Sequence, residues 1–241
     1  AGVSTKEIKT RIRSMESTKQ ITKAMEMVAA SKLRRAQAQV LSSRPYFEIL
    51  HHTIHSIVDA DRDFDSPYLQ KTAGEKILFV VIAGDRGLAG GYNNNVLKLV
   101  LSEIRGKNAA VLPMGKKTVD FFRSRNIPVL DTKHQTAAEV TLGDCFTVAK
   151  QICRRFRGGE FDRICIAYTN FQSVLSQTPA TLQLLPLVRA ETQKSGPRQV
   201  TLYEPGSEEV FDAIVPEYLG GILYGALCES RAAEQAARRT A

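Results

Sequence analysis

The chain has 241 residues and a net charge of +8, and 43% of its residues are hydrophobic and 24% charged, a composition typical of a soluble protein with one large or two small domains. Its longest apolar run, Ile77–Ala83, is far shorter than the ~20 residues of a membrane-spanning helix, so we predict that it is not an integral membrane protein. The N-terminus has no apolar core typical of a secretory signal. The four cysteines form no CxxC pair, and we expect reduced thiols in a cytoplasmic-type compartment.

The positive charge is concentrated at the N-terminus. Residues 1–44 contain ten basic and three acidic side chains, a net charge of +7, so the remaining 197 residues together carry only +1. A basic segment joined to a near-neutral body indicates an acidic partner of one of three kinds: nucleic acid, anionic lipid or an acidic protein surface. The alternative is a solvated helix face without a partner.

The same segment is predicted to form one long helix. Residues 4–44 contain neither Pro nor Gly and are rich in residue types that favour helices. Ser4 and Glu7 fit a capping box, and Pro45 predicts a kink followed by helix through His55. At 1.5 Å per residue, residues 4–44 would span about 60 Å. Apolar residues three or four positions apart form a narrow seam typical of a coiled coil: Ile8, Ile12, Met15, Ile21, Met25, Val28, Ala29, Leu33, Ala36 and Val40.

Strand-like and helix-like segments alternate in the middle of the chain. Residues 76–83, 109–114, 127–130, 163–168 and 181–188 are predicted strands, and residues 96–104, 116–125 and 140–156 are predicted helices. This alternation indicates a doubly wound α/β domain over residues 75–190, followed by a linker at 194–206.

A second long helix is predicted at the C-terminus. After Pro216 the sequence has helical spacing, and the Ala-rich stretch from Ser230 to Ala241 favours a helix. We expect this helix to pair antiparallel with the first one. Because no capping signal stands at Ala241, we also expect the helix to be truncated there.

No segment carries a recognisable catalytic pattern. The glycine-rich residues 84–91 follow the first strand, where an α/β fold would hold a phosphate, but their GxxGxxGG spacing matches neither GxGxxG nor GxxxxGK[ST]. His51, His52 and His55 lack the glutamate of HExxH and any nearby further ligand, and no GxSxG motif occurs. We therefore predict no catalytic residue, no metal site and no cofactor, and interpret the glycines as tight turns.

Three segments resemble the gamma subunit of F-type ATP synthases. Residues 21–37 (ITKAMEMVAASKLRRAQ) resemble its N-terminal helix motif, and residues 229–239 (ESRAAEQAARR) resemble the start of its C-terminal helix. Residues 85–93 (DRGLAGGYN) resemble its central DRGLCGG motif, with Ala89 in place of a common cysteine. The cysteine-bearing insertion of chloroplast members is absent, which favours a bacterial-type subunit.

The resemblance implies both a fold and a function. The fold is α/β: a long antiparallel coiled coil of N- and C-terminal helices, residues 1–66 and 207–241, plus a central Rossmann-like α/β domain, residues 75–190. Family members run further beyond position 241, which agrees with a truncated C-terminal helix. The implied function is that of a non-catalytic central shaft, which transmits torque between a membrane ring and a catalytic head and regulates ATP synthesis and hydrolysis. The implied location is peripheral, on the cytoplasmic face of the bacterial plasma membrane.

The resemblance also implies partners and contact residues. The partners are the alpha and beta subunits of the head, the epsilon subunit and the ring of c subunits. The head-facing collar of the N-terminal helix would include Lys23, Met25, Lys32, Arg34 and Arg35, facing acidic loops of the beta subunits, although packing in the seam explains Met25 equally well. The ring-facing residues would be Tyr203, Glu204 and Pro205. Residues 85–93 would be structural, at or near the foot of the shaft where epsilon docks.

Two rival functions follow from the same residues. The basic N-terminal helix would suit a nucleic-acid binder, but residues 1–44 contain no aromatic side chain on which bases could stack, so we predict no nucleic acid as a partner. The other rival is a nucleotide-dependent enzyme built on the α/β domain.

Overall fold

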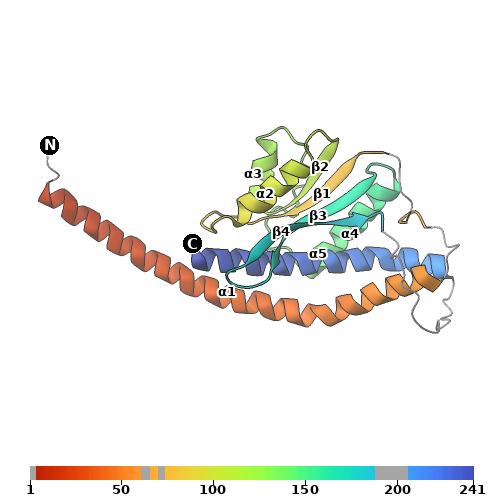
Figure 1. Cartoon of the computed structure of the whole chain (residues 1–241), viewed down its shortest axis with the longest axis horizontal. Coiled ribbons are helices and arrows are strands. Elements are labelled where there is room, and N and C mark those ends of the chain that lie inside the picture. Colours follow the sequence, from red (N-terminus) through yellow and green to blue (C-terminus); the bar gives the residue numbers. More distant parts are fainter. Residues whose placement is uncertain (1–3, 61–65, 70–73, 188–205) are drawn as a thin grey trace.

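The computed structural model in Figure 1 describes residues 4–60, 66–69, 74–187 and 206–241 of the chain. The C-terminal helix lies between the long N-terminal helix and a sheet that carries further helices (Figure 1). The predicted architecture, two long antiparallel helices joined to an α/β body, is confirmed. The elements in chain order are α1 (Thr5–Ala60), β1 (Ile77–Ile82), α2 (Tyr92–Glu103), β2 (Ala109–Met114), α3 (Lys116–Arg123), α4 (Leu142–Arg157), β3 (Arg163–Phe171), β4 (Gln177–Leu185) and α5 (Ser207–Thr240).

Helix α1 is one continuous, curved rod (Figure 1). Its 56 residues correspond to a length of about 84 Å, and the helix passes through Pro45 and ends beyond the predicted His55. The predicted capping box is not formed. The Ser4 hydroxyl accepts a hydrogen bond from the N–H of Lys6 (3.4 Å), and Glu7 pairs instead with Arg11 (3.2 Å).

The two long helices meet through small side chains. Leu33 and Ala36 of α1 are buried in one cluster with Ala232 and Ala236 of α5. Alanines at a helix contact allow the two backbones to approach closely, which is why the Ala-rich end of the chain suits this position. The C-terminal half of the predicted seam is therefore confirmed as the contact with α5.

The N-terminal half of the predicted seam has a different environment. Ile8 (46% exposed), Ile12 (53%), Met15 (73%), Ile21 (58%) and Val28 (54%) face solvent in this chain. For Ile8, Ile12 and Met15 the reason is geometric, because Arg239 near the end of α5 already lies opposite Glu26 of α1, 3.8 Å away. Ile21 and Val28 line a groove that α5 also lines, but both stay more than half exposed. The prediction that this half of the seam is packed on the C-terminal helix is therefore wrong within the described residues.

The body contains a four-stranded sheet with the order β2-β1-β3-β4. Strands β1, β2 and β3 are parallel, whereas β4 runs antiparallel to β3 and starts at Gln177, four residues before the predicted start. The predicted strand at 127–130 contributes only an isolated bridge between Val129 and Val111. The pairing is limited to one residue because both backbone hydrogen bonds that join this segment to β2 are made by Val111, whose N–H donates to the Pro128 carbonyl and whose carbonyl accepts from the Leu130 N–H.

Helices cover both faces of the sheet, as predicted for a doubly wound fold. Leu78 and Val80 of β1 pack in the cluster that contains α4 and α5, whereas Phe79 and Val81 pack with Val96 of α2 and with α3. This alternation follows from the period of two in a strand, and all six residues of β1 are buried, as expected for a strand with two covered faces.

Helix α5 belongs both to the helix pair and to the core of the body. Leu219, Leu223 and Leu227 are fully buried there, and Gly220 lets α4 approach so closely that an added Cβ would lie 2.2 Å from the Phe146 ring. By length and composition alone, residues 208–240 would be long and apolar enough to span a membrane, a possibility that the search for uninterrupted apolar runs missed. The burial of these leucines identifies α5 as a core helix of the body.

Candidate functional site: the glycine-rich loop and the collar groove

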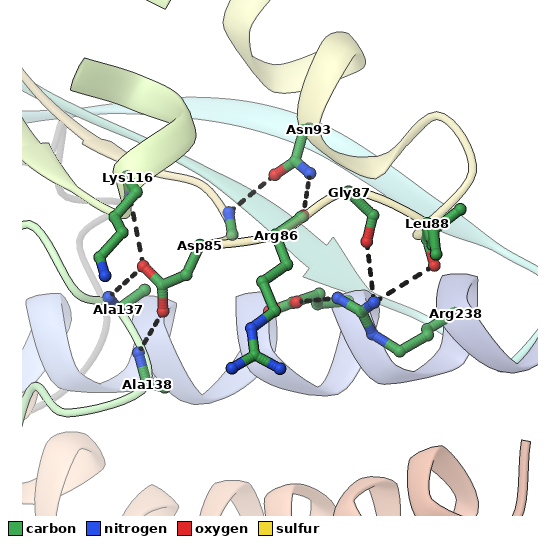
Figure 2. Close-up of polar contacts among 11 residues, drawn as sticks. Asp85, Arg86, Gly87, Leu88, Asn93, Lys116, Ala137, Ala138 and Arg238 are labelled. Atoms are coloured by element: carbon green, nitrogen blue, oxygen red, sulfur yellow. Dashed lines mark hydrogen bonds and ion pairs between the residues drawn. The ribbon is translucent and has the colours of Figure 1, made fainter. Parts of the chain in front are cut away.

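The loop that follows β1 is held by a network of hydrogen bonds between side chains and backbone groups (Figure 2). Asp85 accepts hydrogen bonds from the N–H groups of Lys116 (3.2 Å), Ala137 (2.9 Å) and Ala138 (3.0 Å). A short carboxylate can satisfy three N–H donors at once because it has several lone-pair sites. Asp85 thereby fixes the start of α3 and the 137–138 segment to the end of β1.

Asn93 closes the same loop from its other end (Figure 2). Its side-chain oxygen accepts a hydrogen bond from the N–H of Gly84 (2.7 Å), and its amide group donates to the carbonyl of Arg86 (3.0 Å). These two bonds replace the backbone pairs that a strand or helix would supply.

Two arginines of α5 bind the glycine-rich loop and the neighbouring 137–140 segment to this helix. Arg238 donates to the carbonyls of Gly87 (2.8 Å) and Leu88 (3.4 Å) and forms an ion pair with Glu234 (2.6 Å), as Figure 2 shows in part. About two helical turns earlier, Arg231 donates to the carbonyls at 137 (2.6 Å) and 140 (2.7 Å). Because the Arg238–Glu234 pair is about 15% exposed, it is shielded far better than a surface pair.

The glycines of this region have steric reasons to be there. Gly90 has φ +51°, in the left-handed region that favours glycine. Gly115 has φ +119°, and a Cβ at this position would lie 2.0 Å from the carbonyl oxygen of Ala83. The positive φ of Gly90 supports the interpretation of the loop as a tight turn, whereas a Cβ at Gly87 would meet nothing within 4 Å, so close packing does not explain that glycine.

The loop lies beside the C-terminal end of α5. The motif residues contact positions 234–241 of α5, whereas Gly206, which directly follows the predicted ring-facing residues, precedes the opposite end of that helix. Since 34 residues separate the ends of α5, about 50 Å of helix lies between them. The placement of residues 85–93 at or near the foot of the shaft stays a prediction.

A groove, here called the collar groove, runs where α1, α5 and the glycine-rich loop meet. It has a volume of about 600 Å³. Its lining combines an apolar strip of α1 with four cations and three carboxylates: Ile21, Ala24, Met25, Val28, Lys32, Asp85, Arg86, Lys116, Thr136, Ala138, Glu139, Glu234, Gln235 and Arg238. Three of these charged groups already have partners. Asp85 accepts hydrogen bonds from backbone N–H groups, and Glu234 pairs with Arg238. In the described part of the chain no ion pair involves Lys32, Arg86 or Lys116, so these cations remain available to a partner.

The predicted collar residues have distinct positions on α1. Met25 is half-buried and lines the collar groove together with Lys32. Lys23, Arg34 and Arg35 are exposed on other parts of the helix surface and do not line the groove. The predicted ring-facing residues Tyr203, Glu204 and Pro205 lie outside the described residues.

Sequence reasoning gave no role to Arg231, Glu234 and Arg238, although all three lie within the C-terminal motif. The carbonyl partners of the two arginines are more than 90 residues away in the chain, so no local pattern could reveal them. A weak signal existed: charged residues three and four positions apart on a helix that is otherwise Ala-rich, of which Glu234 and Arg238 pair with each other.

The cysteines are free and buried, as expected for reduced thiols. Burial raises the pKa of the Cys145 and Cys153 thiols to about 12 and that of Cys165 to about 11, so all three stay protonated and unreactive near neutral pH. Among the described residues, no group of three or more His, Cys, Asp or Glu side chains is arranged to hold a metal ion.

Comparison with known proteins supports the family resemblance over nearly the whole chain. Residues 4–241 match the family model described as ATP synthase. The ATP synthase gamma chain of Ruminococcus albus is 43% identical over 98% of this chain and 84% of its own length, and that of Exiguobacterium sp. is 40% identical over 99% of this chain and 85% of its own.

Two solved structures share the fold. The central stalk and c-ring structure of the Tetrahymena thermophila mitochondrial ATP synthase contains a chain with a TM-score of 0.68 and 23% identity, with 91% of this chain and 96% of that chain covered. The rotor of the Euglena gracilis mitochondrial ATP synthase gives 0.60 and 18%, with 98% and 90% covered. Taken with the three motifs and the observed architecture, these matches show that the chain belongs to the ATP synthase gamma-chain family.

Proposed function

We propose that this chain is the central shaft of a proton-translocating rotary ATP synthase and catalyses no reaction itself. In this role it transmits torque between a membrane ring and the catalytic alpha/beta head, and so regulates ATP synthesis and hydrolysis. We assign residues 1–66 and 207–241 to the rod and residues 75–190 to a knob on its side. The observation that carries the proposal is that α5 is at once half of the rod and part of the core of the knob.

A shaft must not slip within the body to which it is fixed. Leu219, Leu223 and Leu227 of α5 are fully buried in the body. Arg231 and Arg238 add hydrogen bonds to backbone carbonyls, which cannot change rotamer or move away as side chains can. A twist applied to the rod is therefore transmitted to the knob through α5.

The collar supports a contact with acidic loops of the head. Lys23, Lys32, Arg34 and Arg35 are exposed on α1, and Met25 lines the collar groove beside Lys32. Exposed charge pairs contribute roughly 0–1 kcal/mol each, so they can favour particular angles without stopping rotation.

The other partners and the location rest on the family. The solved relatives include a central stalk with its c-ring, and the reported curated relatives are bacterial gamma chains. We assign Tyr203, Glu204 and Pro205 to the ring contact, an epsilon subunit to the same complex, and the complex to the cytoplasmic face of the bacterial plasma membrane.

The proposal is tested by isolating the complex from cells that carry a tagged chain and watching it turn. We expect one copy for every three alpha and three beta subunits. Leu175, which is 89% exposed on the turn between β3 and β4, is replaced by cysteine to attach a bead, because the four native cysteines are buried. ATP should then drive rotation of the bead in one direction.

A disulfide inside the rod provides the control. The variant with Ala36→Cys and Ala232→Cys joins α1 to α5 within one apolar cluster, and oxidation should leave rotation unchanged because both helices turn together. A chain that copurifies with no alpha or beta subunit, or a bead that stays still while the complex hydrolyses ATP, would contradict the proposal.

A further inference from the structure

A second pocket, separate from the collar groove, lies at the C-terminal end of α2. It has a volume of about 740 Å³, which is within the range of small-molecule sites in proteins. Its walls come from α2, from the turn between α2 and β2, and from the turn that follows α3. Helix α2 begins beside the glycine-rich loop, and its 12 residues place the pocket about 18 Å from that loop. The pocket is therefore also remote from the end of α5.

The charged side chains of this pocket are all positive. Lys98, Arg105 and Lys107 line it, and no Asp or Glu is among its described lining residues. In the part of the chain that the structure describes, no ion pair involves any of these three cations. The nearby Glu103 instead accepts a hydrogen bond from the Thr181 hydroxyl of β4 (2.7 Å). The pocket therefore attracts a ligand with several negative charges, because the potentials of the three cations add within it.

Closure of the helix end does not account for these cations. The last turn of α2 contains no basic residue. Two backbone N–H groups close the helix: that of Ile104 donates to the Val100 carbonyl (3.0 Å), and that of Lys107 donates to the Ile104 carbonyl (3.0 Å). The side chains of Arg105 and Lys107 are thus not needed as caps and remain available to a ligand.

The rest of the lining suits an organic group. Leu101, Ile104 and Ile127 contribute apolar surface, which an inorganic anion does not need. Asn108 and Asn126 stand beside it. Each side-chain amide combines a donor with an acceptor, the pair with which Asn recognises the edge of an adenine base in nucleic acids. The pocket thus joins a cationic part to an apolar part that carries amide groups.

We propose that this pocket binds a nucleoside triphosphate, with Lys98, Arg105 and Lys107 on the phosphates and the base on the apolar wall beside Asn126. Proteins commonly hold the Mg²⁺ of a nucleotide through carboxylates as well as the phosphates, and the described lining has no carboxylate. Magnesium also neutralises part of the phosphate charge that the three cations attract. The site therefore prefers the free nucleotide to its magnesium complex, and it is a binding site without catalysis.

The test is equilibrium dialysis of the purified full chain with labelled ATP, with EDTA or with excess Mg²⁺, at constant ionic strength. We expect saturable binding of one nucleotide per chain, and a dissociation constant severalfold higher with Mg²⁺ than with EDTA. Tripolyphosphate carries the negative charge without the base, so it should compete at least about fivefold more weakly than ATP, the factor that corresponds to about 1 kcal/mol of lost contact.

Two double variants test the cations. Arg105→Gln with Lys107→Gln removes two exposed cations from the pocket and should raise the dissociation constant for ATP about tenfold, because each exposed charge contact contributes up to about fivefold. Arg123→Gln with Arg154→Gln removes the same charge from exposed positions outside the pocket. This control should leave the dissociation constant nearly unchanged.

A single variant tests the amide without disturbing the fold. Asn126 has φ +56°, a conformation that glycine adopts more readily, so Asn126→Gly should fold normally. It should raise the dissociation constant severalfold for ATP and leave that for tripolyphosphate unchanged. Non-saturating binding, tighter binding with Mg²⁺, or equal competition by tripolyphosphate would overturn the proposal. So would equal dissociation constants in the two double variants, or an unchanged constant for ATP in Asn126→Gly.

Discussion

Met25 lies half-buried in the wall of the collar groove, one helical turn before Ala29, where α1 begins to pack on α5. Its neighbours in the groove include Lys32, Arg86 and Lys116, three cations without an ion pair among the described residues. The half-buried position agrees with packing in the seam, and the contact of Met25 with a partner stays a prediction.

We expect Met25→Lys to impair coupling. A further positive charge in this groove would strengthen the grip on an acidic loop of the head and hold the shaft at one angle. ATP-driven proton pumping by the assembled complex should fall more than ATP hydrolysis does. Met27→Lys is the matched control, because Met27 is 62% exposed and does not line the groove. Equal pumping by both variants would show that Met25 is no contact residue.

Gly115 gives a prediction about stability. Gly115→Ala combines a strained φ of +119° with a Cβ 2.0 Å from the Ala83 carbonyl oxygen, so we expect a loss of about 3 kcal/mol or more in the free energy of unfolding. Gly106→Ala has a similarly positive φ of +74° but open space around its Cβ, and should cost only about 1 kcal/mol. Urea unfolding of the two variants measures the difference, and similar values would mean that the backbone at Ala83 yields.

Single elements differ in how well their sequence defines them. The helix α1 and the strand β1 were predicted correctly. In each case the residues of the segment itself decide its structure: the absence of Pro and Gly over residues 4–44 favours a helix, and the continuous apolar run favours a buried strand. The misassigned strand at 127–130 fits a strand by composition, and only its neighbours decide that one bridge forms. The outer half of the α1 seam also has the right period, but its burial depends on how far α5 reaches.

The same distinction holds for the candidate site. The glycines of the loop were recognisable as turns from their spacing. The roles of Asp85 and Arg238 could not be predicted. Each forms hydrogen bonds with backbone atoms more than 50 residues away, and backbone atoms are the same in every residue type, so the sequence does not indicate these contacts.

Helix α1 should show an electrostatic effect that belongs to the whole element. Arg34→Gln with Arg35→Gln removes two exposed cations, and we expect weaker association of the chain with the head, by severalfold at low salt and less at high salt, because salt screens exposed charges. Arg105→Gln with Lys107→Gln removes the same charge from the knob and should have little effect. Copurification across a salt series tests this, and identical recovery for both variants at every ionic strength would refute it.

At the scale of the whole molecule, burial of ionisable groups predicts how stability depends on pH. The pKa of Cys145 and Cys153 is raised from 9.0 to about 12 in the folded chain, because burial disfavours the thiolate. Well below pH 9.0 these thiols are protonated in both states, so the free energy of unfolding should be unaffected by them. Above it the unfolded state ionises first, and stability should fall as pH rises towards the folded pKa.

Urea unfolding at increasing pH measures this decline. The variant Cys145→Ala with Cys153→Ala should show a shallower decline than the natural chain, although it starts from a lower stability. The same slope in both would assign the alkaline loss to other groups, among them Tyr68, whose pKa burial raises to about 12.

Because α5 serves both rod and knob, a load on the rod is borne by the protein interior. Leu223 is fully buried in the core of the body and belongs to no proposed contact surface. Leu223→Ala should nevertheless make the joint between rod and knob less stiff, because it leaves a void beside α5. The expected signature is wider angular fluctuation of an attached bead at unchanged subunit composition. The packing of the core thus sets how far the knob lags behind the rod in angle under load. A mutation in the interior would delay the rotation of one part relative to the other.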